Sequence, residues 1–146
     1  MNEPTLYDCI ARPQLAAELE RHGSLFAPEK DSILFREGEE ANAVYYLKVG
    51  EGRLAMLAGE TKIVSMRIVA GSVLGLPAVM GGKPYSLTAS VAGQAEIYRI
   101  DRDNFKAILE RDAGSCMDAL RILAAEVRFA RIALRDHLDR WARGEQ

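Results

Sequence analysis

Between residues 24 and 100, short runs of alternating apolar and polar residues are separated by glycine-containing turns. For example, Val64, Met66 and Ile68 alternate with polar neighbours. Because side chains of a strand point alternately to its two faces, this period predicts strands with one buried face. Many short strands with regular turn signals are typical of an antiparallel sandwich or barrel. The sequence therefore predicts a mainly β fold.

Helical periods flank the predicted β region. Residues 13–22 form one amphipathic segment, with a proline suited to its first turn and a glycine directly after it. A short helix is expected over 101–111, and a longer one over 115–143. For the longer helix, Ser115 and Asp118 form a capping-box-like pair. We expect one domain over residues 1–146, with the β region at 24–100.

The long C-terminal helix carries a seam of residues at alternating steps of four and three. The seam consists of Leu120, Ala124, Val127, Arg131, Leu134, Leu138 and Trp141. A helix over 115–143 would be about 40 Å long, which is more than one small domain needs. Heptad spacing predicts a coiled coil with the same helix of a second chain, and hence a homodimer. The other interpretation is a helix folded back along its own barrel.

Composition and charge exclude several classes of function. The 146 residues carry a net charge of -2, which does not favour bulk nucleic acid as a partner. No apolar run reaches the roughly 18 residues of a membrane span, and the N-terminus does not resemble a signal peptide, so a cytoplasmic protein is expected. Cys9 and Cys116 lie too far apart for a zinc or iron–sulfur motif, so no metal site is expected. The chain lacks the common hydrolase, metalloprotease and P-loop motifs, and we expect no enzyme.

The stretch 71–88 interrupts the strand rhythm with four glycines and two prolines. Such a break marks a sharp turn or a close approach of the backbone to a ligand. The segment 76–80 fits one helical turn that begins near Pro77, and free backbone N–H groups beside Gly75 would suit an anion. The other interpretation is an ordinary long connection between strands.

Four segments together carry a resemblance to a known family: Ile33-Leu-Phe-Arg-Glu-Gly-Glu39, Val44-Tyr-Tyr-Leu-Lys-Val-Gly50, Gly71-Ser-Val-Leu-Gly75, and the helix with Phe105, Ile108 and Leu109. With the order of the elements, they resemble the cyclic-nucleotide-binding domain, the cAMP-receptor-type (Crp/Fnr-like) sensor module. The resemblance implies an eight-stranded antiparallel β-roll with an N-terminal helix and a long C-terminal helix. It also implies a regulatory role in signal transduction. Only three residues follow the long helix, so we expect a stand-alone domain without a helix-turn-helix and without direct DNA binding.

In that family, the equivalent of 71–88 is a phosphate-binding cassette. Its glutamate accepts a hydrogen bond from the ribose 2′-hydroxyl, and its arginine pairs with the cyclic phosphate. Here Leu76 stands at the glutamate position and Tyr85 at the arginine position. The loss of two charge-assisted hydrogen bonds, each contributing about 1.5–3 kcal/mol, predicts binding weaker by about 100- to 10,000-fold. We therefore expect cAMP and cGMP to bind weakly or not at all.

The resemblance also defines the residues expected at the ligand site. They are Leu74, Gly75, Leu76, Pro77, Ala78, Tyr85, Ser86, Leu87 and Thr88 of the cassette, and Ala130 and Arg131 of the long helix. The apolar replacements favour an aromatic or amphipathic small molecule. Arg131 has three candidate roles: pairing with a ligand anion, pairing with Glu126 or Asp136 of a second chain, or setting the register of the coiled coil.

Three functions remain open at this level. The pocket binds another small molecule and the long helix reports its occupancy, or the pocket is filled and the chain is a dimeric interaction scaffold. The third is a genuine cyclic-nucleotide binder that uses backbone contacts. Some relatives hold an iron–sulfur cluster or haem. The cluster needs more cysteines than Cys9. The candidate haem ligands are His22, His137, Cys9 and Cys116, and residues of these kinds are more often surface or core residues, so no cofactor is expected. The sequence does not identify the downstream protein.

Overall fold

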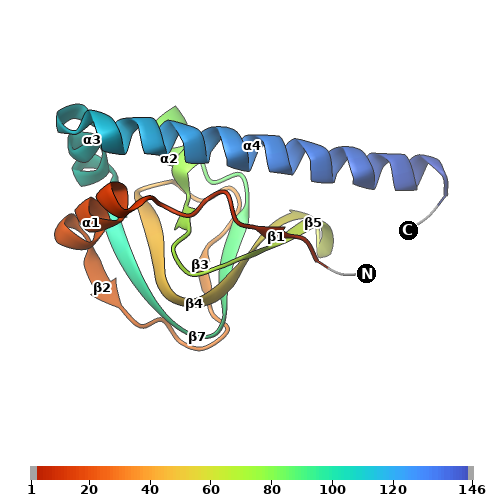
Figure 1. Cartoon of the computed structure of the whole chain (residues 1–146). Helices are drawn as coiled ribbons and strands as arrows, with labels where there is room; N and C mark the ends of the chain where they lie inside the picture. The colour runs from red at the N-terminus through yellow and green to blue at the C-terminus, as the bar shows by residue number, and fades with distance from the viewer. Residues whose placement is uncertain (1–2, 145–146) are drawn as a thin grey trace.

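The computed structural model describes residues 3–144 and arranges them as a curved sheet flanked by helices (Figure 1). Seven strands lie within these residues: β1 (Thr5–Leu6), β2 (Ser24–Phe26), β3 (Ile33–Phe35), β4 (Ala43–Ala58), β5 (Thr61–Ile68), β6 (Val73–Leu74) and β7 (Thr88–Asp101). The helices of the same residues are α1 (Pro13–His22), α2 (Leu76–Gly81), α3 (Arg102–Arg111) and α4 (Ala113–Ala142). None of these helices combines the length and the apolar character needed to cross a bilayer.

The sheet is built around two long antiparallel strands, β4 and β7. Its order is β1-β5-β4-β7-β2, while β3 pairs with β7 and β6 pairs with β4. Every pair is antiparallel except β1 with β5. The β4–β7 register shifts on either side of Val49, and both strands curl around the core there (Figure 1). The two ends of β4 can therefore pair with different partners, β6 near its start and β5 near its end.

The predicted class, a mainly β roll with flanking helices and a long C-terminal helix, is confirmed, but the strand count is not eight. The segments 43–49 and 53–58, predicted as two strands, form the single strand β4. Likewise, most of 86–92 and 95–100 form the single strand β7. Gly50, with φ of +106°, lies in a bend of β4 and does not end it. A Cβ there would approach the carbonyl oxygen of Gln94 to 2.7 Å, so the glycine also permits β4 and β7 to stay paired through the bend.

The long helix begins two residues before the predicted start. Asp112 is its N-cap: the carboxylate accepts a hydrogen bond from the backbone N–H of Gly114 at 3.2 Å and from the hydroxyl of Ser115 at 2.6 Å. Ser115 is therefore a donor within the first turn, and the expected pairing of Ser115 with Asp118 is wrong. A carboxylate at this position is favourable because it accepts from otherwise unpaired N–H groups and opposes the positive end of the helix dipole.

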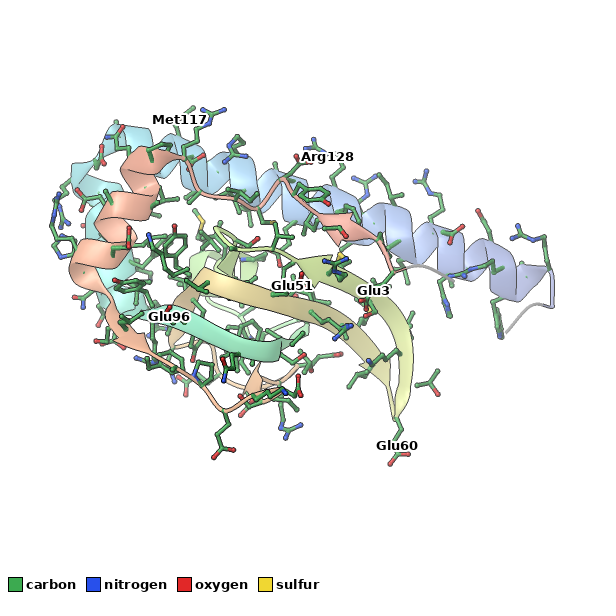
Figure 2. The ribbon with its side chains drawn as sticks, turned by 60° about the horizontal axis from the view of Figure 1, so that its bottom comes forward. Glu3, Glu51, Glu60, Glu96, Met117 and Arg128 are labelled. Atoms are coloured by element: carbon green, nitrogen blue, oxygen red, sulfur yellow. The ribbon has the colours of Figure 1, made fainter. Side chains whose placement is uncertain are left out.

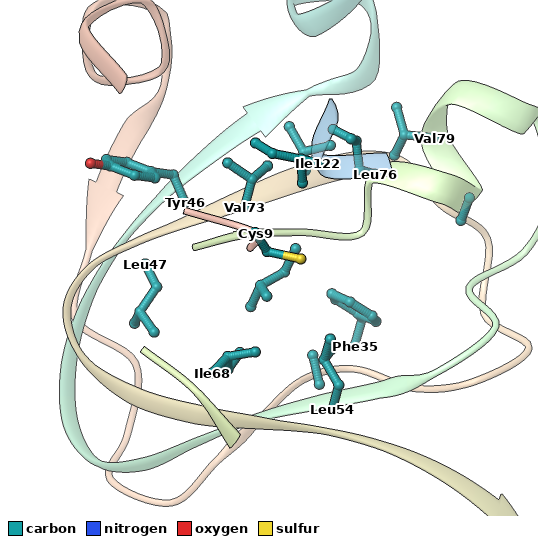
Figure 3. Close-up of a cluster of buried hydrophobic side chains, with 14 of the residues drawn as sticks. Cys9, Phe35, Tyr46, Leu47, Leu54, Ile68, Val73, Leu76, Val79 and Ile122 are labelled. Carbon is teal, nitrogen blue, oxygen red and sulfur yellow. The ribbon is translucent and has the colours of Figure 1, made fainter. Parts of the chain in front are cut away.

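Helix α4 lies across the roll and contacts α1, α2, α3 and β5 (Figure 1). Its last turns extend beyond the sheet. The side chain of Ile122 enters the same buried cluster as Cys9, Leu54 and Leu76, which come from the N-terminal segment, β4 and α2 (Figure 3). The first half of α4 thus closes the core over the cassette.

A polar clamp joins the N-terminal segment to α4. The buried carboxylate of Asp118 accepts hydrogen bonds from the backbone N–H of Arg12 and from Nε of Arg121, both at 2.8 Å. The guanidinium of Arg121 also donates to the carbonyl oxygens of Asp8 at 3.1 Å and Ile10 at 2.7 Å. The carboxylate of Asp118 therefore orients Arg121, and Arg121 holds the segment between β1 and α1 in place.

We expect Asp118→Ala to lower the free energy of unfolding by about 1–3 kcal/mol, because it leaves donors of Arg12 and Arg121 without their acceptor. Urea denaturation followed by circular dichroism measures this change. Asp139→Ala, at an exposed position of the same helix, is the control and should change stability by no more than about 0.5 kcal/mol. Equal losses in the two variants would contradict a specific role for the clamp.

Candidate functional site

Within the cassette, β6 ends at Leu74 and is followed by Gly75, which is left-handed with φ of +87°. A Cβ at this position would lie 3.0 Å from Cε1 of Tyr85 and 3.4 Å from the carbonyl oxygen of Ala43. Glycine is therefore needed both for the backbone conformation and for the space. The chain then forms α2, turns at Gly82 and reaches β7 through an exposed segment at 82–84.

Tyr85, at the position expected for the family's arginine, is fixed on several sides. Its ring stacks on Phe35 with centroids 3.8 Å apart, and its hydroxyl donates to the carbonyl oxygen of Ala43 at 2.6 Å. Its backbone N–H donates to the carbonyl oxygen of Glu39 at 3.0 Å, and its own carbonyl accepts from Gly38 at 2.8 Å. Burial raises the pKa of Tyr85 to about 12, so the phenol is neutral at physiological pH.

The cavity that remains in the cassette has a volume of about 10 Å³. Its lining includes six of the predicted residues: Gly75, Pro77, Ala78, Tyr85, Ser86 and Leu87. Phe35, Leu54 and Glu126 complete the lining. Such a volume holds at most one water molecule, whereas small-molecule sites typically occupy about 300–1,000 Å³. In this conformation the cassette is closed.

The other predicted site residues lie outside this cavity. Leu74 and Leu76 are buried in the core, and Leu76 points toward the cluster that includes Ile122 (Figure 3). The hydroxyl of Thr88 accepts a hydrogen bond from the backbone N–H of Glu37 at 3.0 Å. Ala130 is half-buried and Arg131 is exposed, and the helix meets the cavity one turn earlier.

That earlier residue, Glu126, was not predicted as a cassette residue. Its side chain is 4% exposed, and its Oε2 is buried without a hydrogen-bond partner. Burial raises the pKa of this carboxyl to about 7. Helical spacing from Ala119 through Ile122 to Glu126 places all three on one face, and this was the available signal. The cassette therefore faces a buried carboxyl group from α4.

Two larger hollows lie nearby. One, of about 130 Å³, lies on the other side of the Tyr85–Phe35 stack and is bordered by Glu39, Glu40 and Arg99. The other, of about 570 Å³, lies between β5 and the second half of α4 and shares no lining residue with the cassette cavity. No cluster of metal-ligating side chains occurs among the residues that the structure describes.

The family model for the cyclic nucleotide-binding domain matches residues 28–112, which include the cassette and most of the roll. The chain belongs to the cyclic nucleotide-binding domain family. A search of curated proteins finds no match.

Several solved structures of bacterial proteins share the fold. The c-di-GMP-responsive regulator CLP of Xanthomonas campestris is 12% identical, with a TM-score of 0.74 over 90% of this chain and 65% of CLP. The catabolite activator protein of Thermus thermophilus is 17% identical, with a TM-score of 0.71 over 85% of this chain and 59% of the activator. A protein of a cyclic-GMP-dependent pathway in bacterial phytopathogenesis is 18% identical, with a TM-score of 0.68 over 84% of this chain and 97% of that protein's chain. This chain thus spans less than two thirds of two of these proteins.

Because Glu126 is buried, we expect the free energy of unfolding to fall as pH rises. Its pKa is about 7 in the folded chain and 4.5 ordinarily, so the unfolded state loses this proton first. The free energy of unfolding should therefore drop by about 3 kcal/mol between about pH 5 and pH 7, and the loss should stay constant above pH 7. The hydrogen bond from Ser115 lowers the pKa of Asp112, so the stability that Asp112 contributes is lost only at lower pH.

Chemical denaturation of the wild type and of Glu126→Gln across this pH range measures the effect. We expect the variant to lack the drop and to be more stable than the wild type at pH 8. Glu96→Gln, at an exposed position of β7, is the matched control and should behave as the wild type. A Glu126→Gln variant with the same pH profile as the wild type would show that the carboxyl is solvated.

Proposed function

We propose that this chain is a non-catalytic sensory domain of the cyclic nucleotide-binding family whose cassette binds cAMP and cGMP weakly or not at all. The observation that carries the proposal is the cavity of only about 10 Å³, with a buried carboxyl group, where the family binds an anionic phosphate. None of the described residues that line it is a lysine or an arginine. A cyclic phosphate placed there would lack a cationic partner, and it would be repelled by Glu126 wherever this carboxyl is ionised, because like charges repel strongly in a site of low dielectric constant.

Helix α4 is suited to report the state of the cassette. Glu126 is its last fully buried residue, and beyond it the helix carries exposed and half-buried side chains. A change in the packing of α2 or Glu126 would therefore alter the angle at which the second half of α4 leaves the roll. Movement of a helix at an interface is a common output of regulatory domains.

The same helix is the proposed dimer interface. Six of the seven seam residues are exposed and Leu134 is half-buried; Leu138 is 53% exposed and Trp141 66%. The opposite face, with Phe129 and Ala133, packs along the chain's own roll, so the helix both folds back and leaves the seam, apart from Leu134, uncovered. Met117 and Arg128 also lie on the side that faces away from the roll (Figure 2). An exposed apolar stripe of this length favours association with a second copy.

A dimeric scaffold without any ligand is the second candidate function. It is favoured by the small volume of the cassette cavity and by the bonds that hold Tyr85 in place. The two candidates share the dimer and differ in whether the cassette opens.

Isothermal titration of the purified chain with cAMP, cGMP and c-di-GMP tests the first proposal. We expect dissociation constants of about 1 mM or weaker, because neither charged contact of the family is available at Leu76 and Tyr85. Thermal shift with the same nucleotides is the second readout, since a ligand that binds the folded state raises the melting temperature. A dissociation constant in the low micromolar range for cAMP or cGMP would contradict the proposal.

Analytical ultracentrifugation tests the dimer. The wild type should sediment with twice the 16.1 kDa mass of one chain, and Leu138→Glu should shift it to the monomer by placing a charge in the seam. Ile132→Glu is the matched control: Ile132 is also exposed, at 63%, but lies outside the seam, and this variant should remain dimeric. A monomeric wild type, or equal dissociation of both variants, would contradict the proposed interface.

A further inference from the structure

The Tyr85–Phe35 stack separates two hollows. Both residues line the closed cassette cavity of about 10 Å³ and also the outer hollow of about 130 Å³. Ala43, whose carbonyl oxygen accepts the hydrogen bond from the Tyr85 hydroxyl, also lines the outer hollow. A rotation of the Tyr85 side chain would therefore join the two spaces and add the volume of the ring. The exposed glycine-containing segment at 82–84 directly precedes Tyr85.

The inner end of the joined space is an unpartnered acid in an apolar wall. Glu126 Oε2 has no hydrogen-bond partner, and the surrounding residues include Phe35, Leu54 and Pro77. The Cys9 thiol lies close enough to feel the charge of Glu126. Burial raises the pKa of this thiol more than the Glu126 charge does, and the thiol stays neutral. An ionised carboxylate without a counter-ion is costly in such a place. A bound cation would remove that cost.

The outer end is also acidic. Glu39 and Glu40 border it, and the Glu39 carboxylate is oriented by the backbone N–H of Arg36 at 2.6 Å. Arg99 is the cationic residue of this lining, and it is engaged in an ion pair with Asp101. The field at the entrance therefore attracts cations and disfavours anions.

We propose that the cassette, opened by movement of Tyr85, binds a small organic cation: a protonated amine on an aromatic or aliphatic body, with Glu126 as its counter-ion. The apolar body would take the place of the Tyr85 ring against Phe35 and Leu54, and the ammonium group would donate to Glu126. This inference rests on the proposed sensory function and deepens it by naming the class of ligand.

Proton linkage follows from the same geometry. A cation binds best to the ionised carboxylate, so its affinity should rise from pH 6 to pH 8. Because occupancy removes an unpaired charge at the last buried turn of α4, it would also strengthen the packing of this helix on the roll.

Benzylamine is the probe, with benzyl alcohol as its neutral counterpart and benzoate as its anionic counterpart, in thermal-shift and calorimetric titrations at pH 8. We expect only benzylamine to raise the melting temperature of the wild type, and Glu126→Gln to weaken its binding by about 10- to 100-fold. Glu96→Gln should bind like the wild type. Tyr85→Phe, which removes the hydrogen bond to Ala43, should bind several-fold more tightly because less energy is needed to open the site.

No binding of benzylamine at millimolar concentration, or equal binding by the wild type and Glu126→Gln, would overturn the inference. Equal binding of benzyl alcohol would also overturn it, because it would assign the affinity to the apolar wall alone. The nucleotide titrations separate this inference from the function on which it rests. If neither nucleotides nor benzylamine bind, the inference fails alone; if cAMP or cGMP binds at low micromolar concentration, the proposed function fails.

Discussion

The packing of the first half of α4 on the roll is the constraint on which the other features depend. Ala119, Ile122 and Ala125 are buried there, and Ile122 shares the cluster that contains Leu76 of α2. The Asp118 clamp ties the N-terminal segment to the same half of the helix. One helix therefore closes the core, covers the cassette and orders the start of the chain, so its position and the shape of the cassette cannot change independently.

This arrangement changes the electrostatic character of the cassette. The family uses it to hold an anion, whereas here it presents a neutral phenol and a buried carboxyl group. In the proposed function, Tyr85 occupies the space and Glu126 gives it the opposite charge preference. In the same proposal the turn at Gly75 and the contact of α2 with α4 are those of a sensor, while the chemistry that it could recognise differs.

The second half of α4 has two faces, one packed on the roll and one exposed. Phe129 and Ala133 pack on the chain's own roll, while the seam with Val127 and Leu138 stays exposed. The two interpretations that the sequence left open, a folded-back helix and a helix for a partner, concern different faces of the same element. Glu126 faces the cassette near the middle of this helix, and the proposed interface runs along another face of the same helix, which is a suitable arrangement for coupling.

The sequence by itself determined the elements that depend on local periodicity: the mainly β body, the helix at Pro13–His22, the glycine turn of the cassette and the heptad seam. Tertiary structure decided how those elements join. A glycine such as Gly50 gives the same local signal in a turn and in a bend, and only pairing with β7 makes β4 one continuous strand. Likewise, the helical period grouped Glu126 with Ile122, but the crossing of α4 over α2 decided that Glu126, and not Arg131, faces the cassette. Periodicity fixes the relative phase of residues on a helix, while contacts with other elements fix where that face points.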